Sequence, residues 1–274
     1  MRNNYIVGII GAGNMGEALI KGLLRSNLVR SYEILASCKT ARHVRRLEKT
    51  YGIHTTQKNL SITSATDTVI LAVKPQDMAG VCREIAPTMT KDHLVISIAA
   101  GIDIERLRGM LGRKPRLIRV MPNLPAIIDQ GISAIYCTPR MPERYRRFAH
   151  QIFQAVGDTV DVGDEKLMDV ITGLSGTGPA YFFAMMEALE GAGRKMGLPE
   201  KLSRLLTLQT AVGAAELAQM NGKSPADLRE QVTSTKGTTW AAMKYLRGKD
   251  FWKTMEDAVR AATKRAHELR TGKA

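Results

Sequence analysis

The residues best suited to bind a ligand form a glycine-rich loop near the start of the chain. Gly11-Ala-Gly13-Asn-Met-Gly16 follows an apolar run at residues 5–10 and opens an amphipathic stretch. In such a loop the first glycine makes a tight turn, the second lets the backbone approach a pyrophosphate, and the third lets the helix pack on the strand. The helix N-terminus adds unpaired N–H groups and the positive end of its dipole. The loop therefore predicts a dinucleotide site, and the alternative is a glycine turn that binds no nucleotide.

The end of the second predicted strand indicates which dinucleotide would bind. Proteins that bind NAD usually place Asp or Glu there, about 20 residues after the loop, to hold the ribose 2′-OH. This chain instead has Ala36-Ser-Cys-Lys-Thr40, followed by Arg42 and Arg45. Hydroxyls and cations can bind a 2′-phosphate, which a carboxylate would repel. The pattern favours NADP(H); NADH stays an alternative, and so does an exposed Lys39 that binds nothing.

Two further side chains are of types that catalysis often uses. Lys74 lies in Leu71-Ala-Val-Lys-Pro75, at the carboxyl end of a predicted strand, where open α/β sheets place their ligands. It could be a catalytic acid, but a lysine that contacts the cofactor or solvent fits the same pattern. Ser175 lies in Gly173-Leu-Ser-Gly-Thr177, which lacks the second glycine of the G-x-S-x-G nucleophile motif. We therefore expect a structural turn at Ser175.

Up to about residue 164, short β-branched runs alternate with amphipathic stretches. This alternation predicts βαβ units, and the nearly continuous apolar runs predict strands that helices cover on both faces. Together with the glycine loop, it predicts a Rossmann-type α/β domain, doubly wound around a mostly parallel sheet, over residues 1–164. The predicted strands are residues 5–10, 33–36, 68–73, 94–98, 117–121, 131–136 and 159–162, and the predicted helices are residues 16–26, 41–51, 76–85, 104–111 and 142–156.

After residue 164 the strand signals stop. Residues 180–218 are dense in alanine and glycine, which let helix backbones approach each other closely. An all-helical domain is therefore predicted over residues 165–274. It could stand alone, or it could share its core with a second copy as a dimerisation domain. The predicted helices are residues 166–172, 180–196, 200–220, 225–232, 239–247 and 251–269.

Composition limits the other functional classes. No apolar run approaches the ~20 residues that span a bilayer, and the run at residues 5–10 is too short for a signal peptide, so we expect a cytoplasmic protein. Three scattered cysteines and five scattered histidines predict neither disulfides nor a metal site. A net charge of +14 could attract nucleic acid, or an anionic cofactor or substrate, but the basic clusters are more simply interpreted as solvated helix faces. The aromatic content of 5% argues against a nucleic-acid surface.

Five motifs, in their order along the chain, closely resemble those of pyrroline-5-carboxylate reductases. The resemblance implies reduction of the cyclic imine Δ1-pyrroline-5-carboxylate to L-proline with NAD(P)H, the last step of proline biosynthesis. It also implies helical domains that interleave in an intertwined dimer, with each site completed at the interface, and rings of dimers in some members. The motifs are the glycine loop, Leu71–Pro75, Ile118-Arg-Val-Met-Pro-Asn-Leu-Pro125, Thr172-Gly-Leu-Ser-Gly-Thr-Gly-Pro-Ala-Tyr181 and Leu228-Arg-Glu-Gln-Val-Thr-Ser-Thr-Lys-Gly-Thr-Thr239.

The resemblance also implies roles for individual residues. The loop from Ser234 to Thr239 would bind the substrate carboxylate, helped by the helix N-terminus that follows Gly237. Thr239 would lie near the imine nitrogen as an orienting group or weak general acid. The implied substrate residues are Glu165, Ser234, Gly237, Thr238 and Thr239, and the implied cofactor residues are Gly11, Ala12, Gly13, Asn14, Met15, Gly16, Ser37, Lys39, Thr40, Asn59, Ala72, Val73, Lys74, Ala99 and Ala100.

The substrate loop departs from the family pattern. It commonly reads Ser-Pro-Gly-Gly in the family, whereas this chain has Ser234-Thr-Lys-Gly237. Lys236 replaces a flexible glycine. It either adds an attractive charge beside the substrate carboxylate, or strains the backbone if φ is positive there.

Two other functions stay open. A different imine or hydroxyacid reductase would share the architecture. However, β-hydroxyacid dehydrogenases place a catalytic lysine four residues after their G-x-x-G-x-G, and here Gly178 is followed by Pro-Ala-Tyr-Phe182. A non-enzymatic protein that binds nucleic acid would fit the net charge and the altered loop, but it would not need the intact glycine loop and Thr239.

Overall fold

The computed structural model describes residues 5–272, which form two compact units. The first, here called the sheet unit, contains the chain up to Thr177 and the segment from Ala261 onward. The second, the helical unit, is Gly178–Arg260. Compact packing thus groups residues 165–177 with the sheet, and the domain boundary predicted at residues 164/165 stays a prediction.

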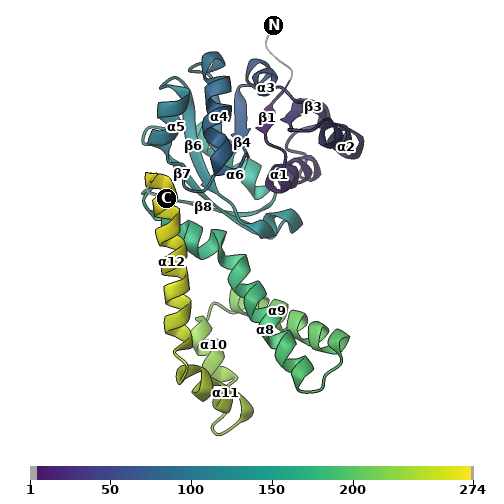
Figure 1. Cartoon of the computed structure of the whole chain (residues 1–274), viewed down its shortest axis with the longest axis vertical. Coiled ribbons are helices and arrows are strands. Elements are labelled where there is room, and N and C mark those ends of the chain that lie inside the picture. Colours follow the sequence, from purple (N-terminus) through teal and green to yellow (C-terminus); the bar gives the residue numbers. More distant parts are fainter. Residues whose placement is uncertain (1–4, 273–274) are drawn as a thin grey trace. The chain divides into compact units, whose positions relative to one another are not determined.

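The sheet unit is built on eight strands in the order β3-β2-β1-β4-β5-β6-β7-β8 (Figure 1). All pairings in this sheet are parallel except that of β6 with β7, which is antiparallel. The mostly parallel sheet is therefore confirmed. The strands are β1 (Val7–Ile10), β2 (Ile34–Ser37), β3 (His54–Thr56), β4 (Thr68–Leu71), β5 (Leu94–Ser97), β6 (Arg116–Met121), β7 (Gly131–Cys137) and β8 (Gly157–Asp161).

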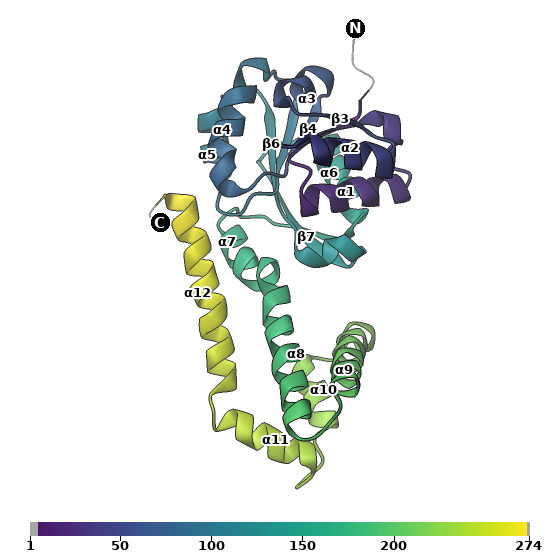
Figure 2. The same ribbon diagram turned by 45° about the vertical axis from the view of Figure 1, so that its right-hand side comes forward.

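Helices cover both faces of this sheet (Figure 2). On one face, α1 (Asn14–Arg25), α2 (Ala41–Tyr51) and α6 (Glu143–Gln154) bury side chains such as Leu19, Leu47 and Phe153. On the other, α3 (Asn59–Ala65), α4 (Pro75–Ile85) and α5 (Ile104–Leu111) bury Ile62, Met78 and Leu107. Two separate cores on one sheet are what a doubly wound fold requires. The Rossmann-type prediction is confirmed.

Among the strands and α-helices of this unit, two were not predicted from the sequence. Strand β3 has three residues, none of them buried, and pairs with β2 alone at the edge of the sheet. Helix α3 has seven residues with the sequence NLSITSA, of which only Ile62 and Thr63 are buried. Neither segment contains the apolar run or the helical period on which sequence reasoning depends.

The chain leaves the sheet through α7 (Leu167–Ile171), which continues into a π-helical turn at Thr172–Gly176. The hydroxyl of Ser175 donates to the carbonyl of Ile171 at 3.2 Å. The structural turn expected at Ser175 is thus helical and prolongs α7, because the side chain bonds one helical turn back.

The described residues of the helical unit form helices joined by short turns, with no strand among them. Gly222 ends α9 with φ of +66°, and Ser224 starts α10 as a capping box with Pro225 in its first turn. The all-helical prediction is confirmed. The helices are α8 (Gly178–Lys195), α9 (Glu200–Asn221), α10 (Pro225–Gln231), α11 (Thr238–Arg247) and the first part of α12 (Phe251–Thr271).

Two observations concern the whole described chain. Within residues 5–272, no helix combines the length and apolar character that crossing a membrane requires. Cys38, Cys82 and Cys137 are free thiols. Burial raises the pKa of the Cys82 and Cys137 thiols to about 11.

Candidate functional site

A pocket of about 470 Å³ opens beside the carboxyl ends of β1 and β4. These neighbouring strands are followed by α1 and α4, which cover opposite faces of the sheet. Such a reversal leaves a crevice in which doubly wound proteins bind their ligands. The pocket is lined by Gly11, Ala12, Gly13, Cys38, Lys39, His43, Ala72, Val73, Lys74, Gln76 and Asp77.

Glycine is needed at each of the three positions of the loop for a different physical reason. Gly11 has φ of +91°, and a Cβ there would lie 2.6 Å from Cγ1 of Val73. A Cβ on Gly16 would lie 2.7 Å from the carbonyl oxygen of Gly11, so the helix could not approach the turn. Gly13 is exposed at the N-cap of α1, and a Cβ there would point into open space, with no protein atom within 4 Å. The loop thus fits a pyrophosphate held against the N-terminus of a twelve-residue helix.

The end of β2 holds the glycine loop through backbone hydrogen bonds. The backbone N–H groups of Gly11 and Ala12 donate to the carbonyl of Ser37 at 3.1 and 3.0 Å. The Ser37 hydroxyl donates to Oδ1 of Asn59 at 2.7 Å, and Nδ2 of Asn59 donates to Glu84 at 2.7 Å. The structure therefore brings the predicted residues Ser37 and Asn59 together. Neither is among the residues that line the pocket, so in this structure they support it.

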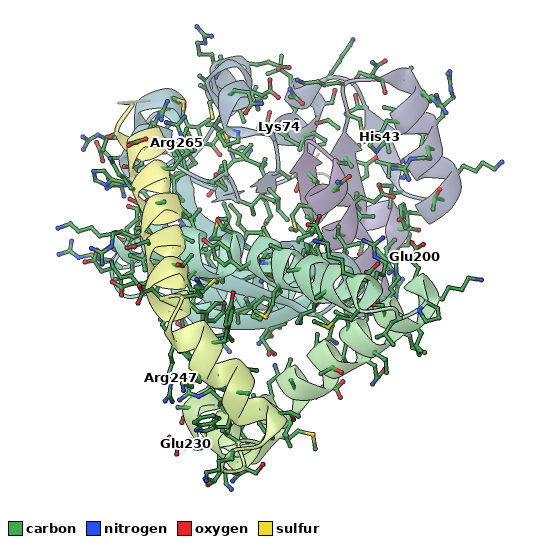
Figure 3. All side chains as sticks on the ribbon, turned by 60° about the horizontal axis from the view of Figure 1, so that its bottom comes forward. His43, Lys74, Glu200, Glu230, Arg247 and Arg265 are labelled. Atoms are coloured by element: carbon green, nitrogen blue, oxygen red, sulfur yellow. The ribbon has the colours of Figure 1, made fainter. Side chains whose placement is uncertain are left out.

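Three basic side chains line the pocket: Lys39 after β2, His43 in the first turn of α2, and Lys74 after β4. Figure 3 labels His43 and Lys74. Lys39 is 80% exposed, and its Nζ lies 3.0 Å from Oδ2 of Asp77. Thr40 caps α2 by accepting from the backbone N–H of His43 at 3.3 Å. His43, Gln76 and Asp77 were not predicted. The signal was available, because each lies in the first turn of a helix that follows a predicted strand end.

A cluster centred on Glu17 joins α2 to α1 beside the pocket. Arg46 donates to the Glu17 carboxylate at 2.7 Å, and the Tyr51 hydroxyl donates to it at 2.9 Å. The hydrogen bond from Arg46, opposed by desolvation, lowers the pKa of Glu17. Arg46 is therefore paired with Glu17. Arg42 and Arg45 are exposed and form no ion pair among the described residues.

The predicted residues Ala99 and Ala100 follow β5 in a loop that leads to α5. Glu165 lies next to this loop. Its Oε1 accepts from the backbone N–H of Ile104 at 2.8 Å and lies 3.4 Å from the Arg119 guanidinium. The Glu165 carboxylate is thus engaged with the start of α5, and its predicted contact with substrate stays a prediction.

The predicted substrate loop lies in the helical unit, between α10 and α11. The N–H of Gly237 donates to the carbonyl of Ser234 at 3.0 Å, which closes the turn. Lys236 has φ of +61°, so the strain anticipated from the sequence at this position is present. Thr238 and Thr239 begin α11, and Thr239 is half-buried.

Beside this loop, a second pocket of about 280 Å³ lies between α10 and α11. Glu230 and Arg247, on its wall, come from these two helices (Figure 3). Lys244 lies 5.2 Å from the ring centre of Trp240, which gives the pocket an aromatic wall with a cation on it. Sequence reasoning did not single out these residues. The lining residues are Arg229, Glu230, Thr233, Trp240, Met243, Lys244 and Arg247.

The predicted site residues thus fall into two groups. The cofactor residues and Glu165 belong to the sheet unit, and Ser234 to Thr239 belong to the helical unit. No cluster of three or more His, Cys, Asp or Glu side chains suited to a metal ion occurs between residues 5 and 272.

Comparison with known proteins gives matches to both parts of the chain. Residues 165–269 match the family described as pyrroline-5-carboxylate reductase dimerisation, and residues 6–101 match the family described as NADP oxidoreductase, coenzyme F420-dependent. The chain is 40% identical to the pyrroline-5-carboxylate reductase of Pseudomonas aeruginosa over 263 residues, 96% of each chain. It is 38% identical to that of Pisum sativum over 98% of this chain and 97% of the relative.

Solved structures agree over the full length. A pyrroline-5-carboxylate reductase from Coxiella burnetii superimposes with a TM-score of 0.88 at 35% identity, covering 97% of this chain and 99% of that one. The Plasmodium falciparum pyrroline carboxylate reductase with NADP bound also gives a TM-score of 0.88, at 28% identity, over 98% of this chain and 100% of that one. The order of the motifs, the doubly wound sheet and these relatives agree, and the chain belongs to the pyrroline-5-carboxylate reductase family.

Proposed function

We propose that this chain reduces Δ1-pyrroline-5-carboxylate to L-proline with NADPH as the hydride donor. The observation that carries the proposal is the open space at Gly13, at the N-terminus of α1, in a chain of this family. A side chain at that position would occupy the place where a pyrophosphate approaches the helix. The Plasmodium falciparum relative, with NADP bound, supports the same class of cofactor.

The reaction needs a hydride donor and an electrophilic imine. When bound, NADPH supplies the hydride to C5 of the ring, the C=N π pair moves to the protonated nitrogen, and NADP⁺ and proline result. Because the cofactor supplies the hydride, the protein's task is to bind, orient and neutralise charge.

The residues of the sheet unit fit the binding of NADPH. The first N–H groups of α1 face the pyrophosphate position, and Lys39 offers a cation for the 2′-phosphate. The absence of a carboxylate at positions 36–40 favours NADPH, and NADH stays the alternative. Lys74 lines the same pocket, where it could neutralise a phosphate.

The residues of the substrate loop fit the other half of the task. The turn Ser234 to Gly237 precedes α11, so the first N–H groups of that helix can bind the substrate carboxylate. The Thr239 hydroxyl would bind at the ring nitrogen and hold the proton that makes C5 electrophilic. Glu165 is the further substrate candidate, although its carboxylate already accepts from Ile104.

The site would be completed by self-association. The match to a dimerisation family and the exposed apolar side chains of α8 and α9 support an intertwined dimer. Rings of dimers, a cytoplasmic location and the lack of nucleic-acid binding stay predictions.

The direct test adds pyrroline-5-carboxylate to the protein and NADPH. Oxidation of NADPH is measured as the loss of reduced-nicotinamide absorbance, and proline is identified as the product. Saturable turnover is expected with NADPH. No turnover with either NADPH or NADH would overturn the proposal, and salt-sensitive DNA binding in its place would favour the non-enzymatic alternative. Activity measured on a panel of hydroxyacids and other cyclic imines distinguishes pyrroline-5-carboxylate reduction from the other reductase alternative.

Gly13→Ala is the matched variant for this test. Its Cβ meets no protein atom within 4 Å, so the fold should be kept, with a fall of at most about 2–4 °C in thermal midpoint because alanine is a poorer N-cap residue than glycine. The methyl group should nevertheless displace the pyrophosphate and raise KM for NADPH about tenfold or more. An unchanged KM for NADPH in Gly13→Ala would contradict the assignment of the glycine loop as the cofactor site.

A further inference from the structure

The largest fully buried side chain of the chain's described part is Arg119, in the middle of β6. The residue is 1% exposed, and a cation in such a place requires carboxylates around it. Two are present. Glu165 lies 3.4 Å from one guanidinium nitrogen, and Asp169 lies 3.8 Å from another.

Glu165 transmits this interaction to the backbone. The same Oε1 that faces Arg119 accepts from the N–H of Ile104 at 2.8 Å. Ile104 is the first residue of α5, and Asp103 caps the same helix by accepting from the N–H of Arg106 at 2.8 Å. The first turn of α5 is therefore held by one local cap and by one carboxylate that Arg119 holds in place.

The segment held in this way contains predicted cofactor residues. Ala99 and Ala100 lie between β5 and Ile104, a connection of six residues. At the N-terminal end of the segment, β5 fixes it, since Ser97 pairs with Arg119 in the sheet. At the C-terminal end, the hydrogen bond from Ile104 to Glu165 fixes it. Arg119 thus acts at both ends of the loop, through its backbone at Ser97 and through its side chain at Ile104.

The end of α12 fixes the remaining side of the loop. Arg270 donates to Asp169 at 2.8 Å and lies 3.5 Å from Asp103, and Arg106 donates to the carbonyl of Leu269 at 3.0 Å. Gly101 has φ of +69°, and a Cβ there would lie 2.7 Å from Cβ of Leu269. The loop therefore has little space in which to move.

We propose that Arg119 is a positioning residue for NADPH: through Glu165 it fixes the segment of Ala99 and Ala100 against which the cofactor binds. The inference rests on the proposed function for the identity of the cofactor. It gives Glu165 a different role from direct contact with substrate, and the two roles predict different kinetics.

The test uses Arg119→Met, which removes the charge and keeps most of the volume, and Glu165→Gln, which keeps an acceptor for Ile104 but removes the charge. The expected result for Arg119→Met is a rise of about tenfold or more in Kd for NADPH, measured by quenching of intrinsic fluorescence. KM for pyrroline-5-carboxylate should change less than about twofold. With NADPH deuterated at the transferred position, the kinetic isotope effect on kcat should increase, since a misplaced donor slows the hydride step.

Arg116→Met is the control, because Arg116 lies on the same strand and its side chain bonds the carbonyl of Lys91 instead of the cofactor segment. It should leave Kd, KM and the isotope effect unchanged. Glu165→Gln should show the same signature as Arg119→Met, with the double variant no worse than the more affected single one, because both remove one interaction. A rise in KM for the imine alone in Glu165→Gln would instead place Glu165 on the substrate and overturn the proposal.

A lower thermal midpoint in Arg119→Met, with unchanged Kd for NADPH and an unchanged isotope effect, would show a merely structural arginine and overturn the proposal. If that variant does not fold, Arg119→Lys and Glu165→Gln decide, by the same two readouts. If the wild-type chain does not turn over the imine, the proposed function fails on its own. Kd for NADPH in the variants still tests Arg119.

Discussion

The sheet unit and the helical unit differ in how much of their apolar side-chain surface is buried within one chain. The sheet unit has two cores, with side chains such as Leu19, Ile70 and Phe153 fully buried. In the helical unit, no hydrophobic side chain is buried among the residues described there. Large apolar side chains are instead exposed on α8 and α9: Phe182, Phe183, Leu189, Leu205 (63% exposed), Leu206 and Val212.

This difference separates a unit that is complete in one chain from one that is not. Helices that are apolar on several faces require burial on those faces. Many exposed large apolar side chains on two neighbouring helices are typical of an interface with another protein. Because the matched family is a dimerisation domain, a second copy is the natural partner. The cofactor half of the site should therefore form without a partner, and the substrate half should depend on one.

The largest expected effect comes from placing a charge on the apolar face of α9. Leu205→Glu should weaken self-association by more than about a hundredfold, because a carboxylate buried in an apolar interface costs about 3 kcal/mol or more. Light scattering after size exclusion measures the assembly. Turnover should fall with it, whereas NADPH binding should persist. Leu60→Glu, on α3 of the sheet unit, is the control and should leave the assembly intact. An unchanged mass for Leu205→Glu would contradict the comparison.

The next effect concerns the chemistry assigned to the helical unit. Thr239→Ala should lower kcat about a hundredfold, because the ring nitrogen loses the hydroxyl that holds its proton. The fold and the assembly should not change, since Thr239 is only half-buried. Steady-state kinetics with the imine provide the measurement, and Thr254→Ala, on exposed α12, is the control. Wild-type kinetics in Thr239→Ala would refute its role.

A smaller effect tests the choice of cofactor in the sheet unit. Replacing Lys39 and Arg42 by Ala should raise KM for NADPH about fivefold, because exposed charge–phosphate contacts contribute about 1 kcal/mol. KM for NADH should change little. Since Asp77 pairs with Lys39 at 3.0 Å, Asp77→Asn should free the lysine and lower KM for NADPH. Equal effects on both dinucleotides would remove the argument for a 2′-phosphate site.

The smallest effect sharpens the account of the substrate loop. At φ of +61°, Lys236 bears a cost of about 1–2 kcal/mol that glycine avoids, while glycine adds about 0.5–1 kcal/mol of unfolded-chain entropy. Lys236→Gly should therefore stabilise the protein by about 0.5 kcal/mol, a rise of roughly 1–2 °C in thermal midpoint. Calorimetry measures the midpoint, and a lower midpoint would contradict the strain. If the lysine also attracts the substrate carboxylate, KM for the imine should rise, most strongly at low salt.

Much of the fold was predictable because its signals are local. Helix α2 and helix α5 have the predicted bounds, since each begins at a capping Thr40 or Asp103 and carries a helical period. The glycine loop was predictable for the same reason. Strand β3 was not, because at the sheet edge it has no apolar face to reveal it.

The site was less predictable because its supports come from distant parts of the chain. Arg119 is one of two arginines in an otherwise apolar strand, and its role depends on Glu165, 46 residues later. Arg270 reaches Asp169 across 101 positions. No local pattern contains these pairings. His43, by contrast, lies in the first turn of α2, directly after a predicted strand end, so its place in the pocket could have been predicted.

The free cysteines have a consequence for the chemical resistance of the molecule. With thiol pKa values of about 11, Cys82 and Cys137 would each be ionised in only about one molecule in ten thousand at pH 7. The thiolate is the form that peroxides and electrophiles attack. Cys38 borders the dinucleotide pocket, and desolvation raises its pKa as well. The three cysteine thiols are therefore unreactive, and the protein should tolerate thiol-directed electrophiles that inactivate enzymes with reactive cysteines.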